Sequence, residues 1–351
     1  MKAVVLCDRG KAELREVEKP QIDAGDILIE VKACGICGSD LHFYYGGLEP
    51  VGEVPFTLGH EFAGVIVEMG IDVDKKWSIG ERVVSDNTGG ACGECYSCSK
   101  GDFVACVNRQ VLVVTMDGGF TKYVKIPGAI LKMYKNCLWK IPENIGFQEA
   151  TLMDPAANGY NAVIQQGKMK SGENIVVFGV GALGLMAIAQ ANIAGAAKII
   201  AVGMSADRKN REALALHYGA TQFLASDEVD ILQTIQEYIE GEEIALIIDA
   251  VGHPSVMRVA AQLVRAQGRI IRIGLNSGGY GDSMDILSIK NISLIGHMGY
   301  NQESWKNTLA LVKKGRLDLK TIISLELPLE EYHKGFEMSK YQEAAKVVLT
   351  P

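Results

Sequence analysis

Three glycines that follow a short apolar run constrain the fold of this chain more than any other feature. Gly179, Gly181 and Gly184 have the spacing Gly-x-Gly-x-x-Gly, directly after an expected strand over 174–178 and at the start of a helix that continues to Ile193. The first glycine permits a tight turn, the second lets the backbone approach a pyrophosphate, and the third lets helix and strand pack closely. The phosphates then lie at the N-terminus of the helix. This context predicts a dinucleotide-binding fold.

The pattern after Asp154 supports this prediction, although three glycines alone also fit a tight turn in other α/β proteins. Short apolar runs alternate there with helix-length segments, at 175–178, 199–202, 222–224, 246–249, 270–273 and 292–295. Six strands separated by helices predict a doubly wound parallel sheet of the Rossmann type. A helix over 303–314 and a closing strand over 345–349 are expected to follow this sheet.

The first part of the chain has a different residue pattern. From Met1 to about Ile141 it predicts short strands joined by glycine turns, most clearly at 27–32, 64–69 and 82–85. The length of 351 residues is typical of two domains, so we expect an α/β protein with a β-rich domain and a parallel-sheet domain. The uncharged stretch 174–197 is long enough to cross a bilayer, but its glycines and polar residues favour a buried strand that turns into a buried helix.

Composition excludes several classes of partner. The formal net charge of −7 disfavours nucleic acid and an anionic membrane, because a net-negative surface does not attract either. Charged residues after the first apolar run prevent a signal-peptide core, and half of the eight cysteines fall in one short window. This clustering indicates a reducing, cytoplasmic location and metal-bound thiolates instead of a disulfide scaffold.

The cysteine window has the spacing of a metal site. Cys92, Cys95, Cys98 and Cys106 form Cys-x2-Cys-x2-Cys-x7-Cys. Four thiolates can enclose a tetrahedral Zn(II) with no open position, which predicts a structural zinc site. A redox pair or four unrelated thiols is the alternative. An iron–sulfur cluster also fits the ligand type, but nothing near the loop indicates electron transfer.

A second set of potential metal ligands is dispersed along the first part of the chain. Cys37, His60 with Glu61, and Asp154 offer one thiolate, one imidazole and carboxylates. Such a set can hold Zn(II) with a position left for water or substrate, as a catalytic site requires. Taken singly, His60 also fits a hydrogen-bonded core histidine, and Asp154 before a proline also fits a turn.

The residues after the second strand of the parallel sheet bear on the coenzyme. An NAD site carries a carboxylate about 20 residues beyond the glycine motif, and here that count reaches Gly203. The small residue leaves room for a 2′-phosphate, which Ser205 with Arg208 or Lys209 can bind, so NADP is favoured over NAD. Asp207 lies beyond the strand end and is expected to cap a helix instead.

Taken together, these motifs resemble one family. The segments 35–42 (GICGSDLH) and 59–61 (GHE), the four-cysteine loop and Gly179 to Gly184 occur in the order and spacing of the zinc-dependent medium-chain alcohol dehydrogenases. The likeness covers essentially the whole chain. The segment with Tyr44 and Tyr45 is similar to the sorbitol (polyol) dehydrogenases, whereas the segment 154–158 and the tail 334–336 are similar to L-threonine dehydrogenases.

The resemblance implies a domain plan and a set of ligands. It implies a GroES-like catalytic domain at 1–155 that resumes at 292–351, and a Rossmann NAD(P)-binding domain at 156–291. It further implies that Cys37, His60 and Asp154 bind a catalytic zinc, with Glu61 able to join, although Asp154 is shorter than the usual glutamate and can act through water. The implied coenzyme contacts are Gly179, Gly181, Ala182, Leu183, Gly184, Gly203, Ser205, Arg208, Asn158 near the nicotinamide and Lys346 near the phosphates.

The implied reaction is zinc-dependent hydride transfer. A secondary alcohol (a polyol, a sugar alcohol or its phosphate) is oxidised to the ketone, or the ketone is reduced, with NAD(P) as hydride carrier and two zinc ions per chain. Ser39 and His42 resemble the proton relay of the family, and Asp40 is expected to orient a zinc ligand. The family also implies a homodimer or homotetramer.

Three alternatives remain open at this level. An L-threonine 3-dehydrogenase-like activity fits the same motifs, and no residue identifies the substrate. A zinc-free enone or quinone reductase of the same superfamily is disfavoured by Cys37, His60 and the four-cysteine loop. A non-catalytic zinc- and nucleotide-binding protein is disfavoured by the negative charge and by the catalytic ligand set.

Overall fold

The computed structural model describes residues 1–47, 53–112, 116–134, 136–275, 279 and 283–351, which form two compact units. The first unit contains 1–154 and 318–351, and the second contains 155–317. The first boundary agrees with the expected break near 155. The chain returns to the first unit at 318, later than the expected 292, because the strand at 293–296 pairs with the parallel sheet of the second unit.

The first unit is built mainly on antiparallel strands, although β17 and β18 pair in parallel. Its larger sheet has the strand order β10-β6-β5-β3-β18-β17, with β9 also paired to β3, and a smaller sheet has the order β2-β1-β4. The strands are β1 (Lys2–Asp8), β2 (Lys11–Glu16), β3 (Ile27–Gly35), β4 (Phe56–Thr57), β5 (Glu61–Met69), β6 (Arg82–Ser85), β7 (Thr88–Gly90), β8 (Gln110–Val111), β9 (Tyr123–Ile126), β10 (Leu138–Lys140), β17 (Ile323–Pro328) and β18 (Lys346–Thr350). The helices are α1 (Gly38–Tyr44), α2 (Tyr96–Ser99), α3 (Gly128–Met133), α4 (Phe147–Ala150), the 3-10 turn η3 (Leu329–Glu331) and α12 (Tyr332–Lys340).

Pairing of β3 with β5 in this unit brings the segment that leads to Cys37 close to the segment of His60 and Glu61. In the β3–β5 ladder, Gly35 lies opposite Glu61, so the chain leaves β3 toward Cys37 beside the point where β5 begins. The apolar faces of both strands supply core residues such as Ile29 and Phe62, which are fully buried. Burial of such side chains, about 1.5–3 kcal/mol each, fixes the register, because a one-residue slip would turn the apolar face outward.

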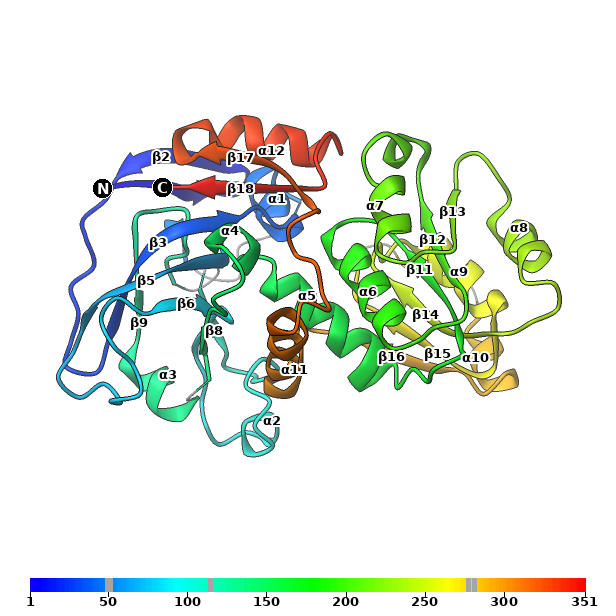
Figure 1. Cartoon of the computed structure of the whole chain (residues 1–351), viewed down its shortest axis with the longest axis horizontal. Helices are drawn as coiled ribbons and strands as arrows, with labels where there is room; N and C mark the ends of the chain where they lie inside the picture. Colours follow the sequence, from blue (N-terminus) through cyan, green and yellow to red (C-terminus); the bar gives the residue numbers. More distant parts are fainter. Residues whose placement is uncertain (48–52, 113–115, 135, 276–278, 280–282) are drawn as a thin grey trace. The chain divides into compact units, whose positions relative to one another are not determined.

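The second unit is the predicted parallel sheet (Figure 1). Its strand order is β13-β12-β11-β14-β15-β16, and every neighbouring pair is parallel. The strands are β11 (Asn174–Phe178), β12 (Ile199–Gly203), β13 (Gln222–Ala225), β14 (Ile244–Asp249), β15 (Val264–Arg272) and β16 (Ser293–Gly296). The helices are α5 (Met153–Tyr160, from Pro155 in this unit), the π-helix η1 (Asn161–Gln166), α6 (Ala182–Ile193), the 3-10 turn η2 (Ser205–Lys209), α7 (Glu212–His217), α8 (Ile231–Tyr238), α9 (Pro254–Leu263), α10 (Asp285–Ile289) and α11 (Gln302–Lys313).

The order of these strands defines a place for a ligand. Because β11 lies between β12 and β14, the chain proceeds outward on both sides of β11, and the strand order reverses there. Doubly wound sheets bind ligands beyond the carboxyl ends of the strands at such a switch point. The three glycines follow β11 directly, at this edge of the sheet.

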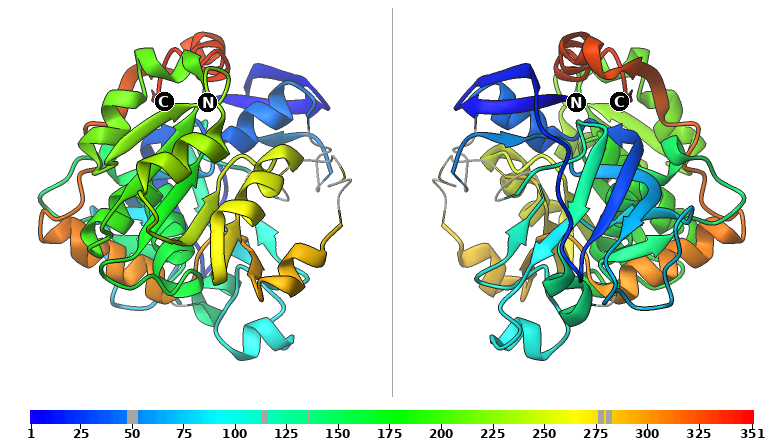
Figure 2. Two further views of the ribbon diagram at one scale, coloured as in Figure 1. Left: turned by 90° about the vertical axis from the view of Figure 1, so that its right-hand side faces the viewer. Right: turned by 90° about the vertical axis from the view of Figure 1, so that its left-hand side faces the viewer.

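Two further features of the fold bear on the expectations. Both ends of the chain lie near each other in the first unit (Figures 1 and 2), because β18 enters the larger sheet beside β3. Within the described residues, we find no helix with the length and apolar character that a membrane span requires. The uncharged stretch 174–197 is instead divided between β11 and α6, as its composition indicated.

Candidate functional site

The dispersed ligand set forms a compact cluster in the first unit. Cys37, His60 and Glu61 each offer a donor atom that lies within 4.8 Å of the donors of the other two. Cys37 is the N-cap of α1, and His60 and Glu61 lie at the start of β5. A thiolate, an imidazole and a carboxylate are the donors that Zn(II) takes in catalytic sites, so the donor set fits this ion.

Asp40 ties the two segments of this cluster together. Its fully buried carboxylate accepts hydrogen bonds from the backbone N–H of Cys37 (2.9 Å) and of Gly59 (3.3 Å). One of its oxygens also lies 3.8 Å from Nδ1 of His60. Burial raises the pKa of Asp40, while His60 and the Cys37 N–H act in the opposite direction. Asp40 therefore fixes the backbone next to two of the potential ligands.

The charge environment of His60 is strongly negative. Burial by itself lowers the pKa of this imidazole, but the nearby Cys37, Asp40 and Asp154 together raise it well above its ordinary value. Asp154 thus lies close enough to His60 for an electrostatic interaction. A buried cluster of acidic groups around one imidazole is an environment that a divalent cation would stabilise.

Lys346 forms a buried ion pair in the first unit. Its ammonium group pairs with the carboxylate of Glu61 and donates a 2.9 Å hydrogen bond to the Ile36 carbonyl. Both side chains of the pair are 2% exposed, so water does not solvate either charge. A buried ammonium requires such a partner, because an unpaired charge in the protein interior is costly. The expected position of Lys346 near the coenzyme phosphates stays a prediction.

Asp154 reaches the cluster from a different direction. It lies in the first turn of α5, is 7% exposed, and accepts a 3.0 Å hydrogen bond from Nδ2 of Asn87. It is not among the three residues whose donor atoms lie within 4.8 Å of one another. Whether the shorter side chain of Asp154 binds the ion directly or through water, as the sequence allowed, stays a prediction.

The two expected relay residues lie on α1. Ser39 is half-buried and His42 is exposed, and their spacing of three residues puts them on the same side of this helix. The contacts described for these residues do not include a hydrogen bond between them. The helix therefore runs from the metal-ligand cluster at Cys37 to an imidazole in contact with solvent.

The four-cysteine loop closes on itself as its spacing predicted. One sulfur atom from each of Cys92, Cys95, Cys98 and Cys106 lies within 4.8 Å of the other three. Backbone N–H groups point at the sulfurs, from Cys92 to Cys106 (3.3 Å) and from Cys95 to Cys92 (3.4 Å). N–H donors of this kind stabilise thiolates, and the backbone N–H of Cys98 lowers the pKa of Cys95 to about 6, whereas burial raises the pKa of Cys98 to about 12. Four such sulfurs fit a closed tetrahedral zinc site.

The glycine motif has the geometry that each of its positions requires. Gly179 has a φ of +91°, which side chains rarely allow. A Cβ at Gly184 would lie 1.8 Å from the carbonyl oxygen of Gly179, so only glycine lets α6 start this close to β11. A Cβ at Gly181 would meet nothing within 4 Å, which leaves space beside the N-terminus of α6. The residues present therefore fit a dinucleotide pyrophosphate.

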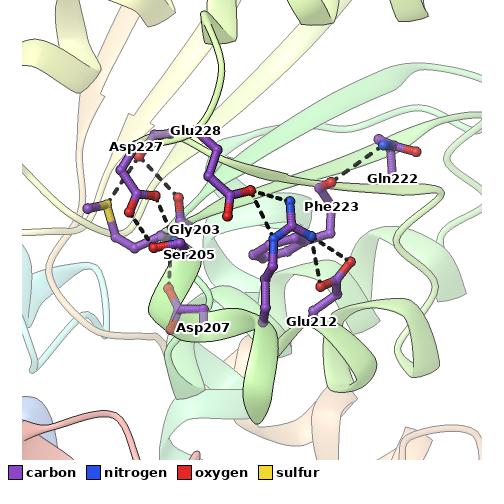
Figure 3. Close-up of polar contacts among 11 residues, drawn as sticks. Gly203, Ser205, Asp207, Glu212, Gln222, Phe223, Asp227 and Glu228 are labelled. Carbon is purple, nitrogen blue, oxygen red and sulfur yellow. Dashed lines mark hydrogen bonds and ion pairs between the residues drawn. The ribbon is translucent and has the colours of Figure 1, made fainter.

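The end of β12 carries more negative charge than the sequence count suggested (Figure 3). Ser205 donates from its backbone N–H to Asp227 (2.7 Å), and its hydroxyl also contacts this carboxylate. Arg208 pairs with Glu228 (2.6 Å) and with Glu212 (3.0 Å). A 2′-phosphate at this position would have to displace Asp227 from Ser205 and the two glutamates from Arg208.

Asp207 has the capping role that was expected. One of its oxygens accepts from the Met204 N–H (2.9 Å), and the other pairs with Arg211 (3.1 Å). A Cβ at Gly203 would lie 2.8 Å from this carboxylate. The carboxylate of Asp207 thus lies where a side chain at position 203 would begin, which explains the absence of an acid there.

Asn158 has a neighbour that the sequence did not indicate. Its side-chain oxygen lies 3.2 Å from Nε2 of His297, whose Nδ1 lies 2.7 Å from Gln166. Burial lowers the pKa of His297 to about 4, so the ring is neutral at pH 7. His297 directly follows β16, at the same edge of the sheet as the glycine motif.

Sequence reasoning missed four participants for a common reason. Asp227 and Glu228 follow β13, Asn87 follows β6, and His297 follows β16. In the parallel sheet, Gly203 pairs with Ala225, so the residues after both strands meet at one edge. Polar residues within a few positions of the end of a strand were the available signal for all four, although Asn87 follows an antiparallel strand of the first unit.

Comparison with protein-family models gives two matches. Residues 23–135 match the alcohol dehydrogenase GroES-like domain, and residues 182–314 match the zinc-binding dehydrogenase domain. Three full-length relatives agree with them. An uncharacterized zinc-type alcohol dehydrogenase-like protein of Escherichia coli is 34% identical over 97% of this chain and 96% of its own length. An L-threonine 3-dehydrogenase of Bacillus licheniformis is 32% identical over 97% and 95%, and a sorbitol dehydrogenase of Halalkalibacterium halodurans is 32% identical over 100% and 99%.

Solved structures share the whole fold. An alcohol dehydrogenase from Escherichia coli, solved with NADH, superposes with a TM-score of 0.89 at 27% identity, over 100% of this chain and 99% of that one. A zinc-binding dehydrogenase from Sinorhizobium meliloti, solved with NADP, gives 0.89 at 26% identity, with the same coverage. The chain therefore belongs to the zinc-binding alcohol dehydrogenase family and is an oxidoreductase with GroES-like and Rossmann domains.

Proposed function

We propose that the protein is a zinc-dependent, NAD(P)-linked dehydrogenase that oxidises a secondary alcohol to a ketone, or catalyses the reverse reduction. The substrate class is a polyol, a sugar alcohol or a sugar-alcohol phosphate. The observation that carries the proposal is the cluster of Cys37, His60 and Glu61 within 4.8 Å, in a chain that also has an intact dinucleotide loop. One site without the other would not support hydride transfer from an alcohol.

Two zinc ions per chain are proposed. Cys37, His60 and Asp154, with Glu61 able to join, would hold the catalytic ion, and Cys92, Cys95, Cys98 and Cys106 would hold the structural ion. When bound, the catalytic ion supplies Lewis acidity toward the hydroxyl oxygen of the substrate. Asp40 holds the backbone of Cys37 and Gly59, so that the thiolate and the imidazole converge before the ion binds.

The proton of the alcohol is proposed to leave along α1. Ser39 accepts it near the cluster while it releases its own hydroxyl proton, which reaches the exposed His42 through intervening water and passes from there to solvent. A histidine is suited to this step because its imidazole can both accept and donate a proton.

The coenzyme is proposed to bind the second unit, with NADP favoured. Gly179, Gly181, Ala182, Leu183 and Gly184 would bind the pyrophosphate at the N-terminus of α6, and Asn158 would contact the nicotinamide. The lack of an acid at Gly203 and the presence of Ser205 and Arg208 support a 2′-phosphate. The ion pairs of Arg208 are exposed and contribute little to stability, so a dianionic phosphate can replace a carboxylate there.

An L-threonine 3-dehydrogenase activity is the second candidate. It is supported by the relative with this name and by the segment from Asp154 to Asn158, which resembles that group. In either case the partner is a small-molecule alcohol or ketone, and a homodimer or homotetramer is proposed.

The test combines metal content with a substrate screen. We expect two zinc ions per wild-type chain and one per Cys37→Ala chain, with turnover by the variant reduced at least 1,000-fold, on the order expected when a Lewis-acid ion is lost. Polyols, their phosphates, 2,3-butanediol and L-threonine are offered with NAD and with NADP. Full turnover and two zinc ions in the Cys37→Ala variant would refute the catalytic site, and turnover of L-threonine alone would select the second candidate.

A further inference from the structure

A chain of polar contacts leads from the four-cysteine loop to Asp154. Arg109 follows the loop, and its backbone N–H donates to the carbonyl of Cys106 (3.1 Å). Its guanidinium donates through Nη2 to Oδ1 of Asn87 (2.6 Å) and to Thr88 (3.2 Å). Nδ2 of Asn87 then donates to Oδ2 of Asp154 (3.0 Å). All of these residues belong to the first unit.

The chemistry of this chain of contacts requires at its centre a group that both accepts and donates hydrogen bonds. A guanidinium only donates hydrogen bonds and an ionised carboxylate only accepts them, so the group between them must accept on one side and donate on the other. The Asn87 amide does both, and its orientation follows from its two neighbours. Asn87 is 8% exposed and Asp154 is 7% exposed, so little water competes for these bonds.

The backbone holds the Asn87 side chain in one place. Asn87 lies between β6 and β7 with a φ of +58°, in the left-handed region that asparagine tolerates better than most residues. Its N–H donates to the Ser85 hydroxyl (3.1 Å), and its carbonyl accepts from the N–H of Leu112 (3.0 Å). The amide is therefore fixed at its root as well as at both of its hydrogen-bonding ends.

We propose that Asn87, supported by Arg109, is a positioning residue that orients the Asp154 carboxylate toward the catalytic metal. This inference rests on the proposed function. With Oδ2 anchored by Asn87, the plane of the carboxylate is set, and Asp154 presents the same edge to the Cys37–His60 cluster each time an ion binds. Aspartate has one methylene fewer than glutamate, so its carboxylate has less freedom to move toward the ion. Its orientation therefore matters more than that of a glutamate would.

The same contacts connect the two metal sites. Arg109 is held at its backbone by the four-cysteine loop and at its guanidinium by Asn87. A change in the loop that displaces Cys106 therefore displaces the donor that fixes Asn87. The four-cysteine loop thus contributes to the geometry at Asp154 in addition to closing its own site.

The test measures metal binding at the Cys37 site directly. Full-length protein that retains its structural zinc, but from which the second ion has been removed, is titrated with Co(II), and the cobalt–thiolate absorption reports occupancy. Asn87→Gly keeps the left-handed backbone and removes the amide, whereas Asn87→Asp replaces the donor with a carboxylate that repels Asp154. Arg109→Lys keeps the charge without the planar fork.

The matched control is Asn291→Gly. Asn291 also has a positive φ, +53°, but it is exposed and lies in the second unit. We expect Co(II) to bind Asn87→Gly about 10-fold more weakly than wild type, and Asn87→Asp at least as weakly, because partners outside the coordination sphere contribute 10- to 100-fold to metal affinity. Arg109→Lys should lose less, and Asn291→Gly should bind like wild type.

Kinetics supply a second measurement. With zinc restored, kcat of Asn87→Gly should fall while KM for the coenzyme stays unchanged, because the coenzyme site lies in the other unit. The double variant Asn87→Gly/Arg109→Lys should be no weaker in Co(II) binding than Asn87→Gly alone, since Arg109 acts through Asn87.

The outcomes separate the two proposals. If wild type binds no Co(II) at Cys37, the proposed function and this inference both fail. If wild type binds Co(II) and catalyses alcohol oxidation, but Asn87→Gly and Asn87→Asp both bind within twofold of wild type, only the positioning role fails. If Asn87→Gly does not fold, Asn87→Asp and Arg109→Lys carry the same comparison, and wild-type affinity in both overturns the inference.

Discussion

At the scale of single residues, the buried carboxylates of the first unit account for most of the unusual electrostatics. Asp40 holds the backbone of Cys37 and Gly59, Glu61 pairs with Lys346, and Asp154 accepts from Asn87. Each carboxylate is buried with a partner, as the cost of an isolated charge demands. All three carboxylates had been singled out from the sequence, as had Cys37 and Lys346, but the pairing of Lys346 with Glu61 and the contact of Asn87 with Asp154 had not.

Asp86 gives a prediction about pH. This carboxyl is fully buried, and burial raises its pKa from 3.8 to about 7, against hydrogen bonds from Tyr134 and Thr88. Between these two values the folded state keeps a proton that the unfolded state has released. The contribution of Asp86 to the free energy of unfolding therefore falls as pH rises from about 4 to 7, by at most about 1.4 kcal/mol per pH unit, and is constant above that window.

Asp86→Asn removes this linkage. Relative to wild type, the free energy of unfolding of the variant should increase steadily from pH 4.5 to pH 7, as measured by urea unfolding at four pH values. The exposed Asp227→Asn serves as the control for loss of an acid. Wild-type and Asp86→Asn curves that run parallel over this range would contradict the assigned pKa.

The acids beyond β13 give a prediction about the coenzyme. Glu228→Gln removes the ion pair between Glu228 and Arg208. Asp227→Asn removes the negative charge of the carboxylate that Ser205 contacts (Figure 3). Each should raise the ratio of kcat/KM for NADP to that for NAD by about fivefold, which corresponds to about 1 kcal/mol. The measurement is steady-state kinetics with both coenzymes. The exposed Glu237→Gln, on α8, is the control, and an unchanged ratio in both test variants would show that these acids do not affect coenzyme choice.

At the scale of secondary-structure elements, the glycines of the turn between β11 and α6 have both a packing role and a proposed binding role. The three glycines differ in what surrounds them: Gly184 is in contact with the Gly179 carbonyl, whereas Gly181 has open space beside it. The same motif therefore contains one position needed for packing and one needed for a ligand.

Two substitutions at this turn should separate these needs. Gly184→Ala places a Cβ 1.8 Å from the carbonyl oxygen of Gly179, and should lower the free energy of unfolding by about 1–3 kcal/mol. Gly181→Ala should leave stability within about 0.5 kcal/mol of wild type, yet weaken coenzyme binding, because its Cβ occupies the space beside the helix N-terminus. Urea unfolding and fluorescence titration with reduced coenzyme measure the two effects. Equal loss of stability in both variants would contradict this division.

At the scale of the whole molecule, each unit has its own core and its own candidate ligand site. The first unit contains both cysteine-bearing metal clusters, and the second contains the dinucleotide loop. A ligand that binds only the folded state stabilises it by mass action. Metal and coenzyme are therefore expected to protect different parts of the chain.

Hydrogen–deuterium exchange tests this separation. Chelation of the metals should speed exchange in 92–109 and around Cys37 and His60, while exchange in β11 and β12 stays slow. A saturating coenzyme should slow exchange at 179–184 and at the residues after β12. Faster exchange throughout both units after chelation would show that the units do not keep separate stabilities.

Much of the fold follows from the sequence because its signals are local. The apolar runs of the parallel sheet predicted all six strands, and the glycine spacing predicted the β11–α6 turn. The compact units divide at 317–318, whereas the resemblance to the family had implied that the catalytic domain resumes at 292; β16, which the apolar pattern had already placed in the parallel sheet, lies in between.

The candidate site was predicted unevenly for the same reason. Cys92 to Cys106 and the glycine motif are closely spaced, so backbone geometry alone brings their members together, and the sequence by itself determined both. The partners of Glu61, Ser205 and Asp154 come from segments far away in the chain. Only the tertiary structure decided those contacts, because they depend on strand register and on the packing of distant elements, which no local spacing records.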